Sequence, residues 1–328
     1  MQNELLELLR CPRTGERLAL EAPEYEGSRI RSGWLVAKTS ANRYPIREFI
    51  PRFVPESNYA ASFGLQWNYF RQTQLDSQSG QPISEHRFWE TTAWDRERLR
   101  DQWVLDCGCG AGRFAEVALA AGAKVVAVDV SSAVDACYAN LKEYANLHVV
   151  QGDIYALPLA RHCFPFVYSL GVLQHTPDVA KAFAALPPMV ASGGRLCADF
   201  YEMTWKHRLL PRHFLRAFTT KMQKERLFDL CRRWVPRFLA VSQRVGRIPK
   251  LGRILVRAIP VADYTGVYDL DQTQLKEWAV LDTFDWLSPE YDQPQHRADV
   301  ARWIAASGFS EVTVLKSGFM IVRGVGKR

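Results

Sequence analysis

Residues 103–114 read WVLDCGCGAGRF, and this stretch decides the fold. A short apolar run ends at Asp106, and glycines follow at positions 108, 110 and 112 before a segment with helical spacing begins. Strand-like apolar runs and helix-like segments then alternate as far as Tyr201. Such alternation predicts a parallel sheet with right-handed crossovers, so the expected fold class is a doubly wound α/β sheet.

The predicted elements fill the middle and the end of the chain. Strands are expected at 103–107, 124–130, 147–153, 164–172 and 194–201, with helices at 113–122, 132–144 and 177–190 between them. In the last of these helices, Pro177 suits the start and Gly193-Gly194 the stop. A helix at 296–309 and a hairpin around Ser317-Gly318 complete the pattern.

Residues 204–290 interrupt the alternation. They are basic and aromatic, and we interpret them as a helical lid over the ligand-binding edge of the sheet. Four prolines are expected to cut this lid into short helices: Pro211, Pro236, Pro249 and Pro260. Between 204 and 260 the sequence has 15 Lys and Arg against only Glu225 and Asp229, so the chain's net charge of +7 originates in this segment.

The bulk composition narrows the class of protein. With 328 residues and 48% hydrophobic content, the chain has ample material for a buried core. No apolar run approaches the roughly 20 residues that cross a bilayer, and the first residues lack the basic-then-apolar plan of a secretory leader. Seven scattered cysteines favour a reducing compartment. We therefore expect a cytoplasmic protein, with attachment to the membrane periphery as a further reading.

The glycine loop lies where open α/β sheets bind ligands, beyond the carboxyl ends of the strands. A dinucleotide fingerprint would place its third glycine at position 113, but Arg113 stands there. A Walker loop is excluded because no Gly-Lys-Ser/Thr follows. A carboxylate at Asp106 would repel a diphosphate and suit a ligand with positive charge, such as S-adenosylmethionine. Cys107 and Cys109 have no partners at metal spacing, so we interpret them as small packing residues.

Three acids follow three successive strands: Asp106, Asp129 and Asp153. A carboxylate at the end of the second strand can accept hydrogen bonds from both hydroxyls of a ribose. An acid at the end of the third strand can accept from an adenine amino group while Ile154 packs on the ring. This constellation is far more specific than the glycines alone.

At this point the chain resembles a known family. The motifs VLDCGCGAGRF, VVAVDVS, VVQGDIYALP, FVYSLGVLQHTPD and the SGGRL turn look like those of class I S-adenosylmethionine-dependent methyltransferases. The resemblance is closest to the small-molecule group that includes quinone-biosynthesis enzymes. It spans residues 100–200 and the end of the chain, and it implies the strand order 3-2-1-4-5-7-6 and S-adenosylmethionine as the cofactor.

Carried over residue by residue, the resemblance assigns the cofactor contacts. The methionine part would lie against Asp106, Gly108, Cys109, Gly110 and Gly112. The ribose would be held by Asp129 with Val130, the adenine by Asp153 and Ile154, and the wall beside the sulfonium would be Gly171 and Val172.

The residues before the sheet divide into two parts. Residues 1–60 resemble the small zinc-ribbon domain that often precedes such methyltransferases, in a degenerate form. Cys11 stands alone there, with Thr14 at its partner position and no other Cys or His before His86, so we expect no metal. Residues 61–100 form an aromatic segment that we expect to cover the cofactor through Gln66, Trp67 and Arg87. The alternative is that its aromatics only dock the segment on the core.

His175 is the candidate catalytic residue. It follows the fourth strand, and a neutral imidazole there could take a proton from a hydroxyl acceptor. The alternative is a histidine that caps a helix or shapes the pocket. Four residues of the returning segment are candidate substrate contacts: Asp282, Asp285, Tyr291 and Tyr268.

The basic lid leaves several readings open. Phe214, Phe218, Met222 and Phe228 have helical spacing with a basic flank, which could lie on an anionic membrane surface. The same segment could bind an acidic substrate or carrier conjugate, contact nucleic acid, or be a solvated lid. Nucleic acid is the least favoured partner, because the sequence contains no recognisable RNA-binding module.

We therefore predict a methyltransferase core at 101–203 and 291–328, with the lid at 204–290. The predicted activity is methyl transfer from S-adenosylmethionine to a small or medium-sized acceptor, anionic or lipid-linked, with oxygen favoured as the methylated atom. The alternatives are a nucleic-acid or protein methyltransferase and a non-catalytic cofactor-binding partner protein. The acceptor and the oligomeric state are left open.

Overall fold

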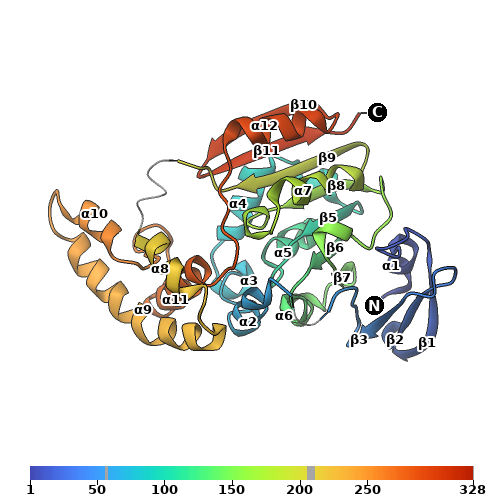
Figure 1. Ribbon diagram of the computed structural model, residues 1–328, viewed down its shortest axis with the longest axis horizontal. Helices are drawn as coiled ribbons and strands as arrows, with labels where there is room; N and C mark the ends of the chain where they lie inside the picture. Colours follow the sequence, from blue (N-terminus) through green and yellow to red (C-terminus); the bar gives the residue numbers. More distant parts are fainter. Residues whose placement is uncertain (56–57, 205–210, 328) are drawn as a thin grey trace.

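The computed structural model describes residues 1–55, 58–204 and 211–327. Residues 205–210 of the expected lid, residues 56–57 of the N-terminal region and residue 328 lie outside the described residues. Figure 1 shows three regions along the molecule: a small N-terminal sheet, a large central sheet with helices on both faces, and a helical arm.

The central sheet has seven strands in the order β10-β11-β9-β8-β5-β6-β7. Five of them are parallel: β5 (Trp103–Cys107), β6 (Lys124–Asp129), β7 (Leu147–Gln151), β8 (Phe164–Ser169) and β9 (Val190–Phe200). The hairpin of β10 (Ser310–Ser317) and β11 (Phe319–Val325) adds to β9 in antiparallel fashion. Numbered from β5, this order is 3-2-1-4-5-7-6, and the predicted fold class is confirmed.

Both faces of this sheet are buried, as expected of parallel strands covered by crossover helices. Alternate residues of one strand enter different cores: Val126 and Val128 face one side, Val125 and Ala127 the other. The first side carries α7 (Val179–Ala184) and α12 (Arg297–Ala306). The second side carries α4 (Ile83–Thr92), α5 (Arg113–Ala120) and α6 (Ala133–Leu141).

The third crossover differs from the prediction. Its helix α7 begins after Asp178, whose side chain accepts from the backbone N–H of Lys181 at 3.0 Å, so Pro177 lies just outside the helix. Gly193-Gly194 lie within β9 and do not end a helix. The close packing of the backbone explains why a glycine is needed at this position. A Cβ at Gly194 would lie 2.9 Å from the carbonyl oxygens of Ala191 and Pro165, so only glycine allows these backbone segments to approach so closely.

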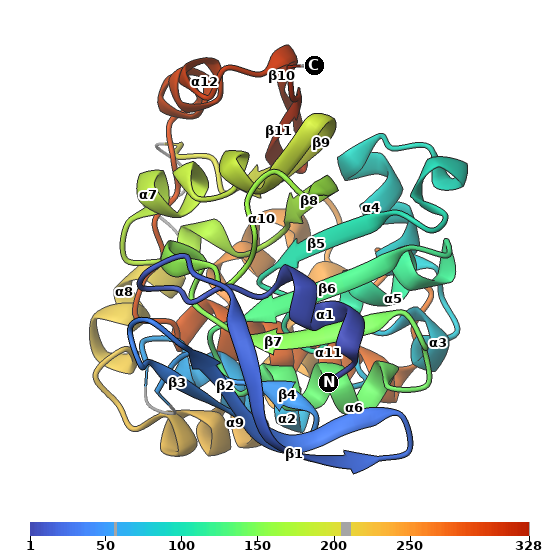
Figure 2. The same ribbon diagram turned by 90° about the vertical axis from the view of Figure 1, so that its right-hand side faces the viewer.

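The N-terminal residues form α1 (Asn3–Leu8) and an antiparallel sheet in the order β1-β2-β3-β4. Its strands are β1 (Leu18–Glu26), β2 (Arg29–Ala37), β3 (Arg43–Arg47) and β4 (Ile50–Pro51). Figures 1 and 2 place this sheet beside β7, and Leu5, Leu9 and Leu35 share a core with the central sheet. Cys11 is buried with its Sγ 3.2 Å from the Tyr44 hydroxyl. Among the described residues, no group of three or more His, Cys, Asp or Glu side chains is arranged to hold a metal.

Three helices then lead to the core: α2 (Ala61–Tyr69), α3 (Asp76–Ser79) and α4. The described part of the lid comprises α8 (Pro211–Thr219), α9 (Lys224–Gly246), α10 (Gly252–Leu255) and α11 (Gln272–Leu287). In the described part of the chain, no helix is long and apolar enough to cross a membrane.

The prediction that Pro236 ends a helix is wrong, because α9 runs through it for 23 residues. One face of α9 packs against α11 through Leu227, Phe228, Cys231, Val235 and Leu239, all of them buried. Burial of this face stabilises the helix on both sides of the proline, which offsets the loss of one backbone hydrogen bond. The predicted single run from Phe214 to Phe228 is also wrong, since it is divided between α8 and α9.

Candidate functional site

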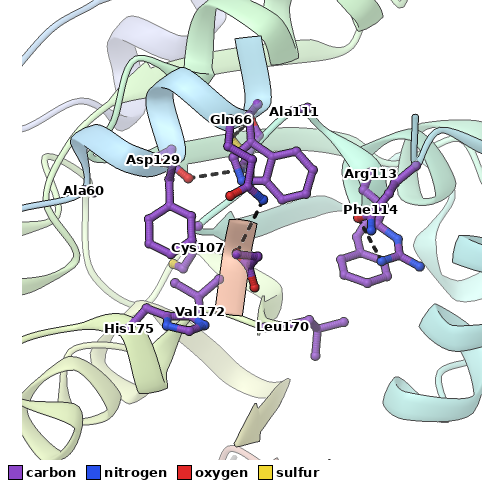
Figure 3. Close-up of a pocket in the computed structure, with 18 of the residues that line it drawn as sticks. Ala60, Gln66, Cys107, Ala111, Arg113, Phe114, Asp129, Leu170, Val172 and His175 are labelled. Atoms are coloured by element: carbon purple, nitrogen blue, oxygen red, sulfur yellow. Dashed lines mark hydrogen bonds between the residues drawn. The ribbon is translucent and has the colours of Figure 1, made fainter. Parts of the chain in front are cut away.

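A cavity of about 590 Å³ lies at the carboxyl ends of the parallel strands. Its floor includes Cys107 at the end of β5, Asp129 at the end of β6 and Gly171 after β8, and α2 and α11 close it from the other side. Figure 3 shows Gln66 and Asp129 on one side of this space, Val172 and His175 opposite, and Arg113 with Phe114 farther along. The fold therefore brings residues from distant parts of the sequence to one site.

The cavity unites most of the residues that the sequence predicts. Fifteen of the predicted site residues line it: Gln66, Trp67, Arg87, Gly108, Cys109, Gly110, Asp129, Val130, Ile154, Gly171, Val172, His175, Tyr268, Asp282 and Asp285. Four do not: Asp106, Gly112, Asp153 and Tyr291.

Four N–H groups of the glycine loop donate to acceptors of the protein itself. The N–H groups of Gly108 and Cys109 both donate to the Val128 carbonyl, at 2.7 and 3.0 Å. That of Gly110 donates to the Asp129 carboxylate at 3.0 Å, and that of Gly112 to the Cys109 carbonyl at 2.9 Å. A phosphate cradle needs such groups directed at the ligand. These four are already satisfied, so they are not available to a diphosphate.

The two cysteines of the loop are inert. A hydrogen bond with Cys137, together with burial, raises the pKa of the Cys109 thiol well above its usual value. Burial does the same to the pKa of Cys107. Both thiols therefore stay protonated at neutral pH, which fits packing and not metal or redox chemistry.

Asp129 is held firmly at the end of β6. One carboxylate oxygen accepts from the Ser131 N–H at 2.8 Å and the Ser131 hydroxyl at 2.7 Å, while the other accepts from Gly110. Burial raises the pKa of this carboxyl, and these hydrogen bonds oppose the rise. Asp129 lines the cavity with its carboxylate held in a fixed direction, and the oxygen that accepts only from Gly110 retains capacity for a further donor.

Asp106 lies beneath the cavity floor, only 2% exposed. Burial raises its pKa to about 8, and the neighbouring Tyr168 hydroxyl opposes the rise only in part. Burial thus favours the neutral form of this carboxyl at neutral pH, which weakens the repulsion of a diphosphate that the sequence predicts. The four loop N–H groups that already donate within the protein give a better reason to expect weak binding of diphosphates.

Asp153 and Gly112 also have positions beside the cavity. The Asp153 carboxylate accepts from the Tyr155 N–H at 3.0 Å and begins a short 3-10 turn, while Ile154 reaches the cavity wall. Gly112 is the left-handed N-cap of α5, and a Cβ there would lie 2.6 Å from Leu141. This glycine serves the packing of α5 on α6.

The covering segment contributes Gln66, Trp67 and Arg87. The Trp67 indole lies over the glycine loop, since a Cβ at Gly110 would be 3.2 Å from its Nε1. Gln66 donates to Asp285 of α11 at 3.4 Å, which joins two helices across the cavity. Arg87 forms an ion pair at 2.9 Å with Asp199, a fully buried side chain.

His175 is positioned by its surroundings. Its Nδ1 lies 3.1 Å from the Tyr291 carbonyl oxygen, so Nδ1 carries the proton and donates. The ring lies between Phe63 and Tyr201, with centroid distances of 5.3 and 5.6 Å. The other nitrogen, Nε2, is then left as the acceptor of a ring that lines the cavity. Tyr291 thus contributes through its backbone and not through its hydroxyl.

The far end of the cavity is a polar network of which sequence reasoning found only Asp282. The Arg113 guanidinium donates to Ser84 at 2.8 Å and to Gln74 at 3.0 Å, and burial lowers its pKa to about 10. Gln74 also donates to Asp282, which accepts from the Tyr264 hydroxyl as well. Burial raises the pKa of Asp282 to about 6. The signal in the sequence was Arg113 itself, a charged residue directly after the glycine loop.

Comparison with known proteins identifies the same region. Residues 105–198 match the sequence family described as "Methyltransferase domain". The chain is 30% identical over 142 residues to a ubiquinone biosynthesis O-methyltransferase of Aromatoleum aromaticum, with 34% of this chain and 56% of that protein covered. It is 36% identical over 91 residues to a malonyl-[acyl-carrier protein] O-methyltransferase of Pectobacterium atrosepticum, with 28% and 35% covered. The chain thus spans about half, or less, of the length of these relatives.

Two solved methyltransferase structures align with this chain at low identity. Human N-acetylserotonin methyltransferase aligns with a TM-score of 0.46 at 12% identity, covering 84% of this chain and 61% of that one. Magnesium protoporphyrin IX methyltransferase from Synechocystis aligns with a TM-score of 0.44 at 16% identity, covering 82% and 97%. The family match covers residues 105–198, from β5 to β9 of the central sheet.

Proposed function

We propose that this chain transfers a methyl group from S-adenosylmethionine to an acceptor bound in the cavity. The observation that carries the proposal is the glycine loop with four N–H groups that donate within the protein, next to a fixed carboxylate at Asp129. This pair suits a nucleoside with ribose hydroxyls and no phosphate. The methyltransferase domain match supports the same conclusion.

The residues present fit such a nucleoside. Asp129 would accept from the ribose hydroxyls, Ile154 would pack against the adenine with Asp153 beside it, and Gly108 and Gly110 leave room for the methionine part. Gly171 and Val172 would form the wall near the sulfonium, with Gln66, Trp67 and Arg87 covering it. When bound, the sulfonium supplies an already activated methyl group. The chain mainly needs to align the acceptor and exclude water, which can contribute about 7–11 kcal/mol in well-oriented systems.

An oxygen acceptor is favoured because of His175. With its Nδ1 proton donated to the Tyr291 carbonyl, Nε2 of a neutral ring can take the proton of an acceptor hydroxyl. The two relatives described above are both named O-methyltransferases, which supports the same atom. Asp282, Asp285 and Tyr268, with Arg113, would contact the acceptor. Their mixed charges suit a small or medium-sized polar molecule, presented free or on a lipid or a carrier.

The role of His175 has a direct test. His175→Ala should lower turnover by about 10²- to 10⁴-fold while the affinity for S-adenosylmethionine stays unchanged. His162→Ala is the matched control, since its Nδ1 also lies near a backbone carbonyl, that of Val190 at 3.3 Å, but it does not line the cavity. Equal turnover in the two variants would remove His175 from the mechanism.

The activity itself is tested by incubating the protein with cell extract and isotopically labelled S-adenosylmethionine, followed by mass spectrometry. We expect one or a few small labelled products that are missing from a parallel incubation with Asp129→Asn. Label confined to protein or nucleic acid would instead support the alternative acceptor classes.

A further inference from the structure

Most of the large hydrophobic side chains that are exposed in the described chain belong to the lid. Of 16 large hydrophobic side chains that are exposed, 11 lie between residues 211 and 260. They are Phe214, Leu215, Phe218, Leu230, Trp234, Phe238, Val241, Ile248, Leu251, Ile254 and Leu255. Single exposed apolar residues are common on proteins, but so dense a group marks an interaction surface.

Helix α9 has two distinct apolar rows. Leu227, Cys231, Val235 and Leu239 form the buried row against α11. Leu230, Trp234, Phe238 and Val241 repeat at helical spacing on another side and are 40%, 45%, 37% and 45% exposed. The first row accounts for the fold of the lid. The second row is not needed for it.

Basic side chains run beside the exposed row. Arg226, Arg233, Arg237 and Arg244 are all exposed and share one side of α9 by their spacing. The guanidinium of Arg237 lies 5.2 Å from the Trp234 ring and that of Arg233 lies 5.9 Å from it. Residues 224–258 contain ten Lys and Arg against two acids. Charge and apolar surface are thus combined on the same helix.

We propose that the arm formed by α9 and α10 binds an anionic membrane surface, with Trp234 and Phe238 in the interface and the arginines on lipid headgroups. A helix with large apolar side chains beside a row of arginines is the pattern of helices that lie in the membrane plane. An acidic protein could form ion pairs with the arginines, but a membrane also buries the row of large aliphatic and aromatic side chains, and we therefore favour the membrane.

The position of the arm gives this contact a use. Helix α11 lies between the arm and the cavity: Asp282 and Asp285 line the cavity, while Phe284 and Leu287 pack in the core shared with α9. Packed helices are separated by about 8–10 Å, so a membrane under α9 lies one helix away from the cavity. Figure 1 shows α9 and α10 projecting from the body of the molecule on the side of α11. The arm would hold the cavity close to acceptors in or on the membrane.

The test uses the full chain and vesicles of phosphatidylglycerol mixed with phosphatidylcholine, with pure phosphatidylcholine vesicles alongside. We expect co-sedimentation with the anionic vesicles, weakening as salt is added. The double variant W234S/F238S should bind on the order of tenfold more weakly or worse. The triple variant R233Q/R237Q/R244Q should bind on the order of 100-fold more weakly at low salt.

The matched control is Trp34→Ser in the N-terminal sheet. Trp34 is 39% exposed and has the Arg43 guanidinium 5.0 Å from its ring, so it resembles Trp234 in exposure and in cation contact. This control should bind vesicles like the unchanged protein. All variants alter exposed residues, so their melting temperatures and their heats of binding to S-adenosylmethionine should stay the same. The outcome on membranes is thereby independent of the outcome on methyl transfer.

Failure of the unchanged protein to bind anionic vesicles at low salt would overturn the proposal. So would equal binding by W234S/F238S and Trp34→Ser. If W234S/F238S abolishes self-association in sedimentation velocity and vesicle binding is unaltered, the row binds a second copy of the chain instead. Tight binding of an acidic carrier protein without vesicle binding would assign the arm to that partner.

Discussion

At the scale of single residues, the site is built from glycines and acids whose roles depend on burial. Gly108 has φ of 92°, a left-handed conformation, and a Cβ there would lie 2.4 Å from Val172 Cγ2. The sequence shows Gly108 but not its contact with Val172, because these two residues meet only in the folded sheet. Asp106 was predictable as a strand-end acid, yet its protonation state depends on depth, which no local pattern encodes.

Gly108→Ala should destabilise the protein by about 3 kcal/mol or more, because strain in the backbone adds to the clash with a β-branched side chain. Gly27→Ala is the control: its φ of 58° is also left-handed, but nothing lies within 4 Å of the added Cβ. That change should cost only about 1 kcal/mol. Thermal unfolding of the two variants measures the difference, and equal losses would show that Val172 does not cover the loop.

Asp106 should make stability depend on pH. Its ordinary pKa of 3.8 rises to about 8 in the folded chain, so between these values the folded state binds a proton that the unfolded state releases. Stability of the ligand-free protein should therefore fall as pH rises through this window. Asp106→Asn removes this titration. The melting temperature of the variant minus that of the unchanged protein should therefore increase as the pH rises from about 5 to about 8. A constant difference across that range would mean that Asp106 is ionised in the fold.

At the scale of elements, the sequence predicts the central sheet well because strands and helices alternate with distinct periods. The strand after the glycine loop's helix, at 124–130, ends one residue earlier in the structure as β6, and the hairpin turn at Ser317-Gly318 lies as expected. The lid is predicted poorly. Local rules place a break at Pro236, whereas the tertiary contact between α9 and α11 overrides it.

The contact between α9 and α11 is the element on which the lid depends. Phe284 is fully buried, and its ring centroid lies 5.2 Å from that of Phe228. Phe284→Ala should destabilise the protein by about 3–5 kcal/mol, whereas Phe218→Ala, at a side chain that is 75% exposed, should change little. Chemical denaturation monitored by circular dichroism measures both. Similar values for the two would indicate that the lid does not unfold with the body of the protein.

At the scale of the whole molecule, three regions converge on one cavity. The central sheet provides the floor, the segment from α2 to α4 provides Gln66, Trp67 and Arg87, and α11 provides Asp282 and Asp285. Asp282 is a candidate from the sequence, but its link through Gln74 to Arg113 could not be predicted, because the three residues come from different regions and meet only in the fold. The acceptor is therefore the part of the function that sequence patterns encode least.

The central claim is that this cavity binds a sulfur-containing nucleoside without phosphate, S-adenosylmethionine or its demethylated product, and rejects diphosphates. Calorimetric titration of the purified chain tests it most directly. S-adenosylmethionine and its demethylated product should both release or absorb measurable heat, ATP and NAD should not, and Asp129→Asn should weaken binding of the product by about 10- to 100-fold. Asp101→Asn, at an exposed position, should bind normally. Binding of ATP or NAD without any response to either sulfur nucleoside would contradict the account.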